Sequence, residues 1–160
     1  MKNQKGFSLI ELLIVVVIIG IIAAIAIPNL LAARRSANEG SAVSALRTIH
    51  GGEFTYQSTA GAGNYGDLAA LETEGIVDSV LGAGQKSGYD FLITEVDADP
   101  GVAPATFDAT AEPDVYGTIA ATGTRSFAIG EVGVLCFDLA GASTGIDAGT
   151  RECNGTVMNN

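Results

Sequence analysis

The amino-acid sequence is poor in the residues on which most catalytic and metal sites depend. Among 160 residues there are one histidine, two cysteines and no tryptophan, and only 8 residues are basic against 18 acidic ones. The net charge of -10 has the wrong sign for a protein that binds nucleic acid over its whole surface. Charged residues make up only 16% of the chain and hydrophobic residues 48%, so the composition also excludes a disordered protein. This length fits one domain, or one domain with an appendage.

The few basic residues are concentrated at the N-terminus. Residues 1–35 contain four basic residues and one acidic residue, whereas residues 59–160 contain three basic residues and fifteen acidic ones. The front of the chain is therefore basic and apolar, and the back is acidic and polar. This asymmetry indicates that the two parts lie in different environments.

A long hydrophobic run lies in the basic part. Residues 12–27 contain no polar side chain, and the run extends back to Phe7 with only Ser8 and Glu11 interrupting it. About 20 apolar residues suffice to cross a bilayer, so we predict a transmembrane segment over about 7–27. A removable signal peptide is the alternative, but its apolar region would be shorter and would end in a small-residue cleavage site. Basic residues flank the run on both sides, so the positive-inside rule gives nearly equal weight to both orientations.

Glu11 is the one charged residue inside this run. An ionised side chain costs roughly 2.5–3.5 kcal/mol at mid-membrane and less near the interface. The positive end of its own helix contributes about 0.3–1 kcal/mol, which does not offset that cost alone. Two explanations remain open: a carboxylate that only the helix dipole stabilises, and a carboxylate that pairs with a positive group of another subunit.

The residues around Glu11 resemble a known processing signal. The sequence KGFSLIELL at residues 5–13 is similar to the cleavage site of type IV prepilins, where a basic leader ends in glycine, phenylalanine follows, and glutamate comes four residues later. The similarity continues to the proline that follows the run. It implies that residues 1–6 are a leader, that a prepilin peptidase cleaves between Gly6 and Phe7, and that the new amino group of Phe7 is methylated.

The same resemblance gives Glu11 a role in assembly. Cleavage would create a cationic amine on Phe7, four residues before Glu11. Opposite charges about 4 Å apart interact by about 4 kcal/mol at an effective dielectric of 20. The amine of one subunit can therefore neutralise Glu11 of its neighbour and fix the axial register between the helices.

Gly20 and Pro28 weaken the helix between them. Pro28 removes a helical hydrogen bond and clashes with the preceding turn, and Gly20 costs about 1 kcal/mol relative to alanine. A fixed kink in a continuous helix is one interpretation, whereas the resemblance to pilins implies a segment that melts during assembly. Beyond Pro28 apolar residues recur at helical spacing, which predicts one helix over residues 7–57 with an amphipathic second half. The pair Gly51-Gly52 is a position where this helix could bend.

Residues 58–160 are predicted to form a globular head. Turn residues end the long helix, and Asp67 is suited to cap a short helix that Gly75 ends. The period of the pattern then changes to two, which predicts strands. After a loop over residues 76–87, the predicted strands are residues 89–95, 105–111, 125–130 and 132–138. The fold class is α+β, a long N-terminal helix packed on an antiparallel sheet, and the strand order is similar to that of major pilins and secretion pseudopilins.

Cys136 and Cys153 are the two cysteines. An even pair in a head outside the inner membrane usually forms a disulfide. A metal pair or a reactive thiol is the alternative, which the absence of a nearby histidine or third cysteine disfavours. A disulfide would attach the glycine-rich tail to the last strand and contribute on the order of 3 kcal/mol. Pilins often close a C-terminal loop in the same way.

Other signals in the sequence are weak. His50 is expected in mid-helix and has no nucleophile motif around it. Residues 97–99 include two aspartates without the spacing of a calcium loop, although pseudopilins can bind calcium in the head. Asn154 begins a formal glycosylation sequence, which is more simply a chance match. Phe54 and Tyr56 are interpreted as core residues rather than as a path for charge transport.

The sequence favours a structural protein over an enzyme, and we predict no catalytic residues, no metal and no cofactor. We expect a major type IV pilin that assembles with its own copies into a surface filament. A piston-like major pseudopilin of type II secretion is the alternative, and a membrane-anchored enzyme is a weaker third. The resemblance implies a prepilin peptidase, an assembly platform, an ATPase motor and an outer-membrane secretin as partners. The subunit would lie in the inner membrane with its head in the periplasm, and at the cell surface after assembly.

Overall fold

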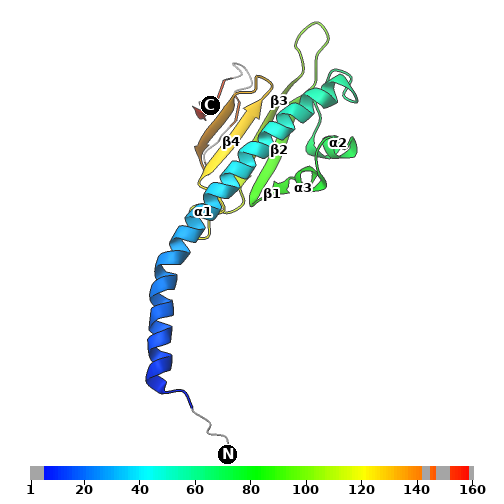
Figure 1. Ribbon diagram of the computed structural model, residues 1–160. Coiled ribbons are helices and arrows are strands. Elements are labelled where there is room, and N and C mark those ends of the chain that lie inside the picture. Colours follow the sequence, from blue (N-terminus) through cyan, green and yellow to red (C-terminus); the bar gives the residue numbers. More distant parts are fainter. Residues whose placement is uncertain (1–5, 142–144, 147–151, 159–160) are drawn as a thin grey trace, which may run out of the picture. The chain divides into compact units, whose positions relative to one another are not determined.

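The computed structural model describes residues 6–141, 145–146 and 152–158. The chain divides into two compact units, residues 1–34 and 35–160. The long helix α1 (Leu9–Ser58) contributes to both units (Figure 1).

The part of α1 in the first unit is apolar on every side. All the large hydrophobic side chains from Phe7 to Leu30 are exposed, and the most apolar window of the helix has a mean hydropathy of 3.2. By length and composition this helix can cross a membrane. It begins at Leu9 rather than at Phe7, because Ser8 lies at the N-cap position, a favoured place for serine.

The described residues of the second unit form a six-stranded antiparallel sheet. Its strands lie side by side in chain order, as predicted for a meander. The strands are β1 (Gln85–Lys86), β2 (Tyr89–Val96), β3 (Thr106–Pro113), β4 (Arg125–Gly130), β5 (Leu135–Leu139) and β6 (Thr156–Val157). The predicted α+β class and the long helix on an antiparallel sheet are confirmed.

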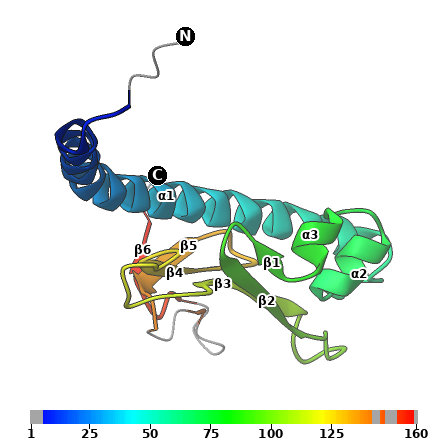
Figure 2. The same cartoon turned by 90° about the horizontal axis from the view of Figure 1, so that it is seen from below.

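The core of the second unit lies between α1 and one face of this sheet (Figure 2). In β2 the side chains of Tyr89, Phe91 and Ile93 are buried, and the intervening residues are exposed, as the period of two predicts. From α1, Leu46 and Ile49 enter the same buried cluster. The second half of α1 therefore holds the sheet through one apolar stripe.

Two short helices follow α1. In α2 (Leu68–Thr73) the predicted cap is present, because the Asp67 carboxylate accepts a hydrogen bond of 2.7 Å from the Ala70 amide. The predicted loop at residues 76–87 is wrong in part, since it contains α3 (Ser79–Gly82) and β1. Asp78 caps α3 by accepting a hydrogen bond from the Leu81 amide.

The last strands differ from the prediction in two respects. The predicted strand at 132–138 begins later, at Leu135, because a turn occupies the residues between β4 and β5. Gly133 in this turn has a φ of 76° and donates a hydrogen bond to the Gly130 carbonyl. The short strand β6 was not predicted; it pairs with β5 at Cys136 and Phe137.

The glycine pair at 51–52 does not interrupt α1. Gly52 is buried, and a Cβ atom at this position would lie 2.8 Å from the Ile76 Cγ2 atom. Glycine therefore lets the segment after α2 pack closely on the helix. The helix is continuous through the glycine pair, and Gly52 instead serves close packing.

Candidate functional site

The predicted cleavage residues lie outside regular structure. Gly6 and Phe7 precede α1, and both are exposed. The Phe7 side chain is 86% exposed. The peptide bond between them is thus open to an enzyme that approaches from outside the chain.

Glu11 has a partner within its own helix in the uncut chain. Its Oε2 atom accepts a hydrogen bond of 2.9 Å from the Ser8 amide. Serine at the N-cap and glutamate three residues later are the two partners of a capping box, in which the glutamate satisfies an amide that the helix leaves unpaired. This local contact was not predicted, and it adds a structural role to the carboxylate.

Gly20 and Pro28 both lie inside a continuous helical assignment. The chain around Gly20 is open, since no atom lies within 4 Å of a Cβ built there. Next to Pro28, the Asn29 side-chain amide donates a hydrogen bond of 3.1 Å to the Ile25 carbonyl. This bond supports the turn that the proline weakens. The structure corresponds to the continuous-helix interpretation, and melting during assembly stays a proposal.

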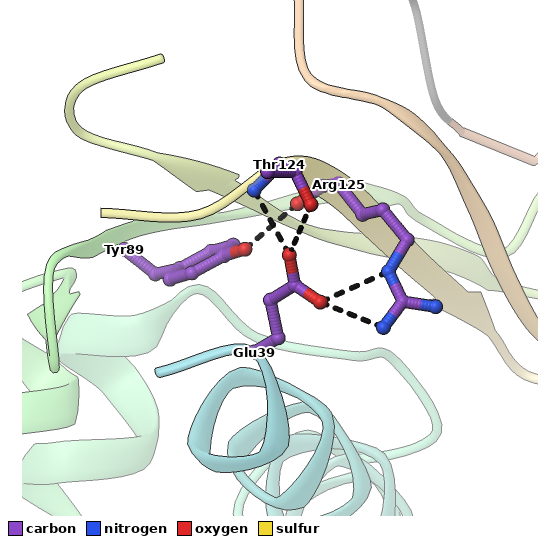
Figure 3. Close-up of polar contacts among 4 residues, drawn as sticks. All are labelled: Glu39, Tyr89, Thr124 and Arg125. Atoms are coloured by element: carbon purple, nitrogen blue, oxygen red, sulfur yellow. Dashed lines mark hydrogen bonds and ion pairs between the residues drawn. The ribbon is translucent and has the colours of Figure 1, made fainter. Parts of the chain in front are cut away.

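A polar cluster joins α1 to the sheet at the beginning of the second unit (Figure 3). We call Glu39, Tyr89, Thr124 and Arg125 the Glu39 cluster. One carboxylate oxygen of Glu39 accepts hydrogen bonds from the Thr124 amide (2.9 Å) and hydroxyl (2.6 Å). The other oxygen accepts two from the Arg125 guanidinium, at 3.0 and 2.6 Å. Both oxygens of a buried carboxylate are thus satisfied by residues that lie 85 and 86 positions away along the chain.

The electrostatics of this cluster favour an ionised Glu39. Burial by itself would raise the pKa of Glu39, but the hydrogen bonds from Thr124 and Arg125 and the arginine charge outweigh it, so that the pKa is lowered. Burial and the Glu39 charge raise the pKa of Tyr89, whose hydroxyl donates a hydrogen bond of 2.8 Å to the Arg125 carbonyl. The cluster therefore works as a fixed joint between helix and sheet.

A second acidic residue of α1, Glu53, is completely buried. Its Oε2 atom accepts a hydrogen bond of 3.0 Å from the Gly66 amide, whereas Oε1 has no hydrogen-bond partner among the residues that the structure describes. Burial raises the pKa of Glu53 to about 7, and the nearby carboxylates of Glu95 and Asp67 add to the effect. Glu53 thus holds the loop after α1 and can change its charge near neutral pH.

The cysteine pair is joined as expected. Cys136 on β5 and Cys153 form a disulfide with Cα atoms 5.7 Å apart. Because β6 follows Cys153 closely and pairs with β5, the covalent bond and the strand pairing hold the same part of the tail. Beyond β6, Met158 is partly buried and packs against the hydrophobic core.

The residues behind the weaker sequence signals do not come together in one site. His50 is half-buried and its Nε2 atom lies 3.4 Å from the Glu131 carbonyl oxygen. Asp99 lies in a turn and pairs with Ala103 through the backbone. No group of three or more potential metal ligands occurs in the described parts of the chain.

The two aromatic residues near the end of α1 differ from each other. Tyr56 packs against the core, as predicted. Phe54 is 41% exposed, so its interpretation as a core residue is wrong. Its ring nevertheless contacts the rings of His50 and Tyr65, with centroids 5.0 and 5.9 Å away.

Glu39 and Glu53 are the residues that the sequence reasoning missed. The buried positions of α1 recur at the spacing of one helical face, and the two glutamates lie on that face. The list of buried residues is Glu39, Ala42, Ala45, Leu46, Ile49, Gly52 and Glu53. The signal in the sequence was the position of two acidic residues on the same helical face as the apolar stripe.

Comparison with known proteins agrees with the N-terminal motif. Residues 1–27 match the prokaryotic N-terminal methylation motif. The type IV wide pilus major component PilA4 of Thermus thermophilus is 69% identical over 39 residues, which are 24% of this chain and 30% of that protein. A fimbrial protein of Pseudomonas aeruginosa is 59% identical over 51 residues, covering 30% of this chain and 33% of the relative. The N-terminal region of this chain is thus similar to those of type IV pilins.

The comparisons also include proteins of type II secretion. The type II secretion system core protein G of Klebsiella pneumoniae is 35% identical over 57 residues, or 36% of this chain and 41% of that protein. The chain thus spans well under half the length of the relatives named here. No solved structure matches this chain significantly.

Proposed function

We propose that this chain is the structural subunit of a type IV pilus, assembled into a surface filament through its N-terminal helix. The observation that carries the proposal is the apolar half of α1, which is exposed on every side and has Glu11 as its one acidic residue. Such a surface is stable only among lipids or among other helices of the same kind. A subunit that moves from a membrane to a filament core meets both environments.

Processing at the N-terminus would control this transfer. A prepilin peptidase removes residues 1–6 and methylates Phe7, which creates a cationic amine beside the helix start. Glu11 then pairs with the amine of a neighbouring subunit. We further propose the inner membrane, with the head in the periplasm, as the location before assembly. The partners are an assembly platform, an ATPase motor and an outer-membrane secretin.

A pseudopilin of type II secretion is the second candidate. The similarity to several core protein G sequences favours it, with 46% identity over 43 residues to the protein of Vibrio cholerae as one example. The disulfide that closes the C-terminal loop supports the pilus instead, because a filament exposed outside the cell benefits from a covalently held tail. For both candidates we propose a structural role and no catalysis.

Imaging and mass spectrometry together test this function. Cells should carry long surface fibres that bind an antibody against the head, and sheared fibres should contain a chain that lacks residues 1–6 and carries one added methyl group. A processed chain that stays in the cell envelope without surface fibres would favour the pseudopilin. A full-length chain in the fibres would overturn the processing scheme.

A further inference from the structure

One end of the sheet carries exposed hydrophobic side chains that the filament proposal does not use. Tyr116, Ile119 and Leu139, which we call the end patch, are 53%, 82% and 72% exposed. Tyr116 and Leu139 line the same hollow of about 320 Å³, together with Arg35. The loop before β4 and the end of β5 therefore place Tyr116 and Leu139 at one hollow beside Arg35, and Ile119 is exposed in the same loop as Tyr116.

Hydrogen bonds fix this surface close to the beginning of the second unit. The Asn38 side-chain amide donates to the Thr122 carbonyl at 2.8 Å, and Glu39 accepts from both the amide and the hydroxyl of Thr124. The loop that carries Tyr116 and Ile119 is thus held against the first residues of α1 in this unit. The loop between β2 and β3 lies at the other end of the sheet (Figure 1).

The chain itself keeps the end patch near the membrane. Arg35 follows Ile27, the last residue of the apolar run, by eight positions. Eight residues span about 12 Å as a helix and at most roughly 28 Å when fully extended. Whatever the orientation of the second unit, its Arg35 end cannot move far from a bilayer that holds the apolar run.

The chemistry of the end patch matches a lipid surface. Tyrosine is enriched at membrane interfaces, where its ring lies among apolar groups and its hydroxyl among headgroups. Isoleucine and leucine gain from burial at the boundary of the acyl chains, and arginine binds lipid phosphates. The exposed Asp114 nearby opposes this contact, and the acidic remainder of the unit is repelled by anionic lipids. The attraction is therefore confined to the end patch.

We propose that the end patch rests on the surface of the bilayer while the subunit is anchored, with Tyr116, Ile119 and Leu139 in the interfacial region and Arg35 at the phosphates. The contact orients the head before assembly and must be released when a subunit leaves the membrane. The proposal rests on membrane anchoring, which the pilus and the pseudopilin candidates share.

A fluorescent label tests the contact in the full chain. Ile119→Cys, labelled with an environment-sensitive dye, is reconstituted at low density in vesicles of phosphatidylethanolamine and phosphatidylglycerol that carry nitroxide-labelled lipids. Val102→Cys is the matched control, because Val102 is 78% exposed in the loop at the other end of the sheet. We expect the label at position 119 to be blue-shifted and quenched several-fold more strongly than the label at 102. Tyr116→Cys repeats the test at a second position.

Two results would overturn the proposal. Equal quenching at 119 and 102 would show that the end patch faces water. A blue shift that grows with protein density, without quenching by the lipid nitroxides, would show that a second copy of the chain covers the patch. Both results leave the proposed pilus function intact, since the fibre and processing measurements test that function separately. Mass analysis without reductant verifies that the Cys136–Cys153 disulfide persists in the labelled chains.

Discussion

At the scale of single residues, three glutamates of α1 have three different environments. Glu11 is exposed in the apolar half and accepts one hydrogen bond from a backbone amide of its own turn. Glu39 is buried and satisfied by four hydrogen bonds, whereas Glu53 is buried with one oxygen that has no partner among the described residues. The same side chain therefore stabilises a helix end, joins two elements or responds to pH, depending on what surrounds it.

Replacing Glu11 separates its capping role from its charge. Glu11→Gln keeps an acceptor for the Ser8 amide, since glutamine also serves in a capping box, but it cannot form an ion pair with an amine. Glu11→Val removes both functions. Both variants should enter the membrane at least as well as the wild type, because the insertion cost of a charge is gone. We expect few or no fibres from either one, measured as sheared fibre relative to membrane-bound subunit. Normal fibre yield from Glu11→Gln would show that the charge is not needed.

Glu53 should make the stability of the head depend on pH. Its pKa is about 7 in the folded chain against a reference value of 4.5, so the folded state binds more protons between these values. The free energy of unfolding should therefore fall as the pH rises from about 4.5 to 7. The difference in free energy of unfolding between Glu53→Gln and the wild type should depend on pH. It should shift in favour of the variant by about 1–3 kcal/mol between pH 5 and pH 8. Urea denaturation of the full chain in detergent measures this, and parallel pH profiles would refute it.

At the scale of elements, the joint between α1 and the sheet combines an apolar stripe with the Glu39 cluster. The stripe supplies the burial, but apolar contacts alone do not fix how far the helix slides along the sheet. The charge-assisted hydrogen bonds of Glu39 have a defined geometry, and they tie this position of the helix to Thr124 and Arg125. The cluster therefore sets the register between α1 and the sheet.

Glu39→Gln should weaken this joint. The change keeps the shape of the side chain but removes the charge that Arg125 and Thr124 satisfy, so we expect a loss of about 1–3 kcal/mol in the free energy of unfolding near neutral pH. Because the pKa of Glu39 is lowered by folding, its contribution should disappear as the pH falls below the usual range of a glutamate. Glu112→Gln, at an exposed position of β3, is the matched control and should change stability by less than about 0.5 kcal/mol. An equal loss of free energy of unfolding in both variants would contradict the proposed role of Glu39 in joining helix and sheet.

The disulfide acts on the last element of the sheet. Strand β6 has only two residues, so its pairing with β5 needs additional support. Cys153→Ser should lower the free energy of unfolding by about 2–4 kcal/mol and speed proteolysis of the C-terminal segment. Reduction of the wild type should have the same effect on proteolysis, and it leaves the sequence unchanged. Two free thiols in the untreated protein, found by mass spectrometry, would show that the bond does not form.

At the scale of the whole molecule, the chain combines a folded acidic unit with an apolar segment that cannot be exposed to water. The second unit has its own buried core, and in the first unit the large hydrophobic side chains from Phe7 to Leu30 are exposed. The apolar segment therefore requires partners outside the chain, either lipid or other copies. Assembly is the expected property of such a molecule, and processing is the step that would time it.

Blocking the processing should leave the head intact while it stops assembly. Gly6→Val places a branched side chain at the cleavage site, so full-length precursor should accumulate in the membrane and fibres should be absent. Its head should still form the Cys136–Cys153 disulfide, because this bond belongs to the separate second unit. Gly6→Ala is the milder control, and intact-mass analysis measures the processed fraction. A chain that loses residues 1–6 despite Gly6→Val would contradict this prediction.

Features that depend on neighbours along the chain could be predicted from the sequence. The apolar run, the processing motif, the Asp67 cap and the alternation in β2 are all local patterns, and the structure has an apolar helix, a capped α2 and a buried face of β2 at these places. The disulfide could be anticipated because only two cysteines exist. Hydrophobic periodicity and turn residues act over a few positions, so they can be recognised in the sequence alone.

The packed fold sets the partners of Glu39 and Glu53, the packing at Gly52 and the grouping of the end patch. Glu39 meets its partners across about half of the chain, and Gly52 is required by a side chain of the segment after α2. The short strand β6 depends on its pairing with β5, since two residues carry no period of their own. Burial and hydrogen bonding between distant segments are set by the packed fold, and no local pattern encodes which partner a buried carboxylate will meet.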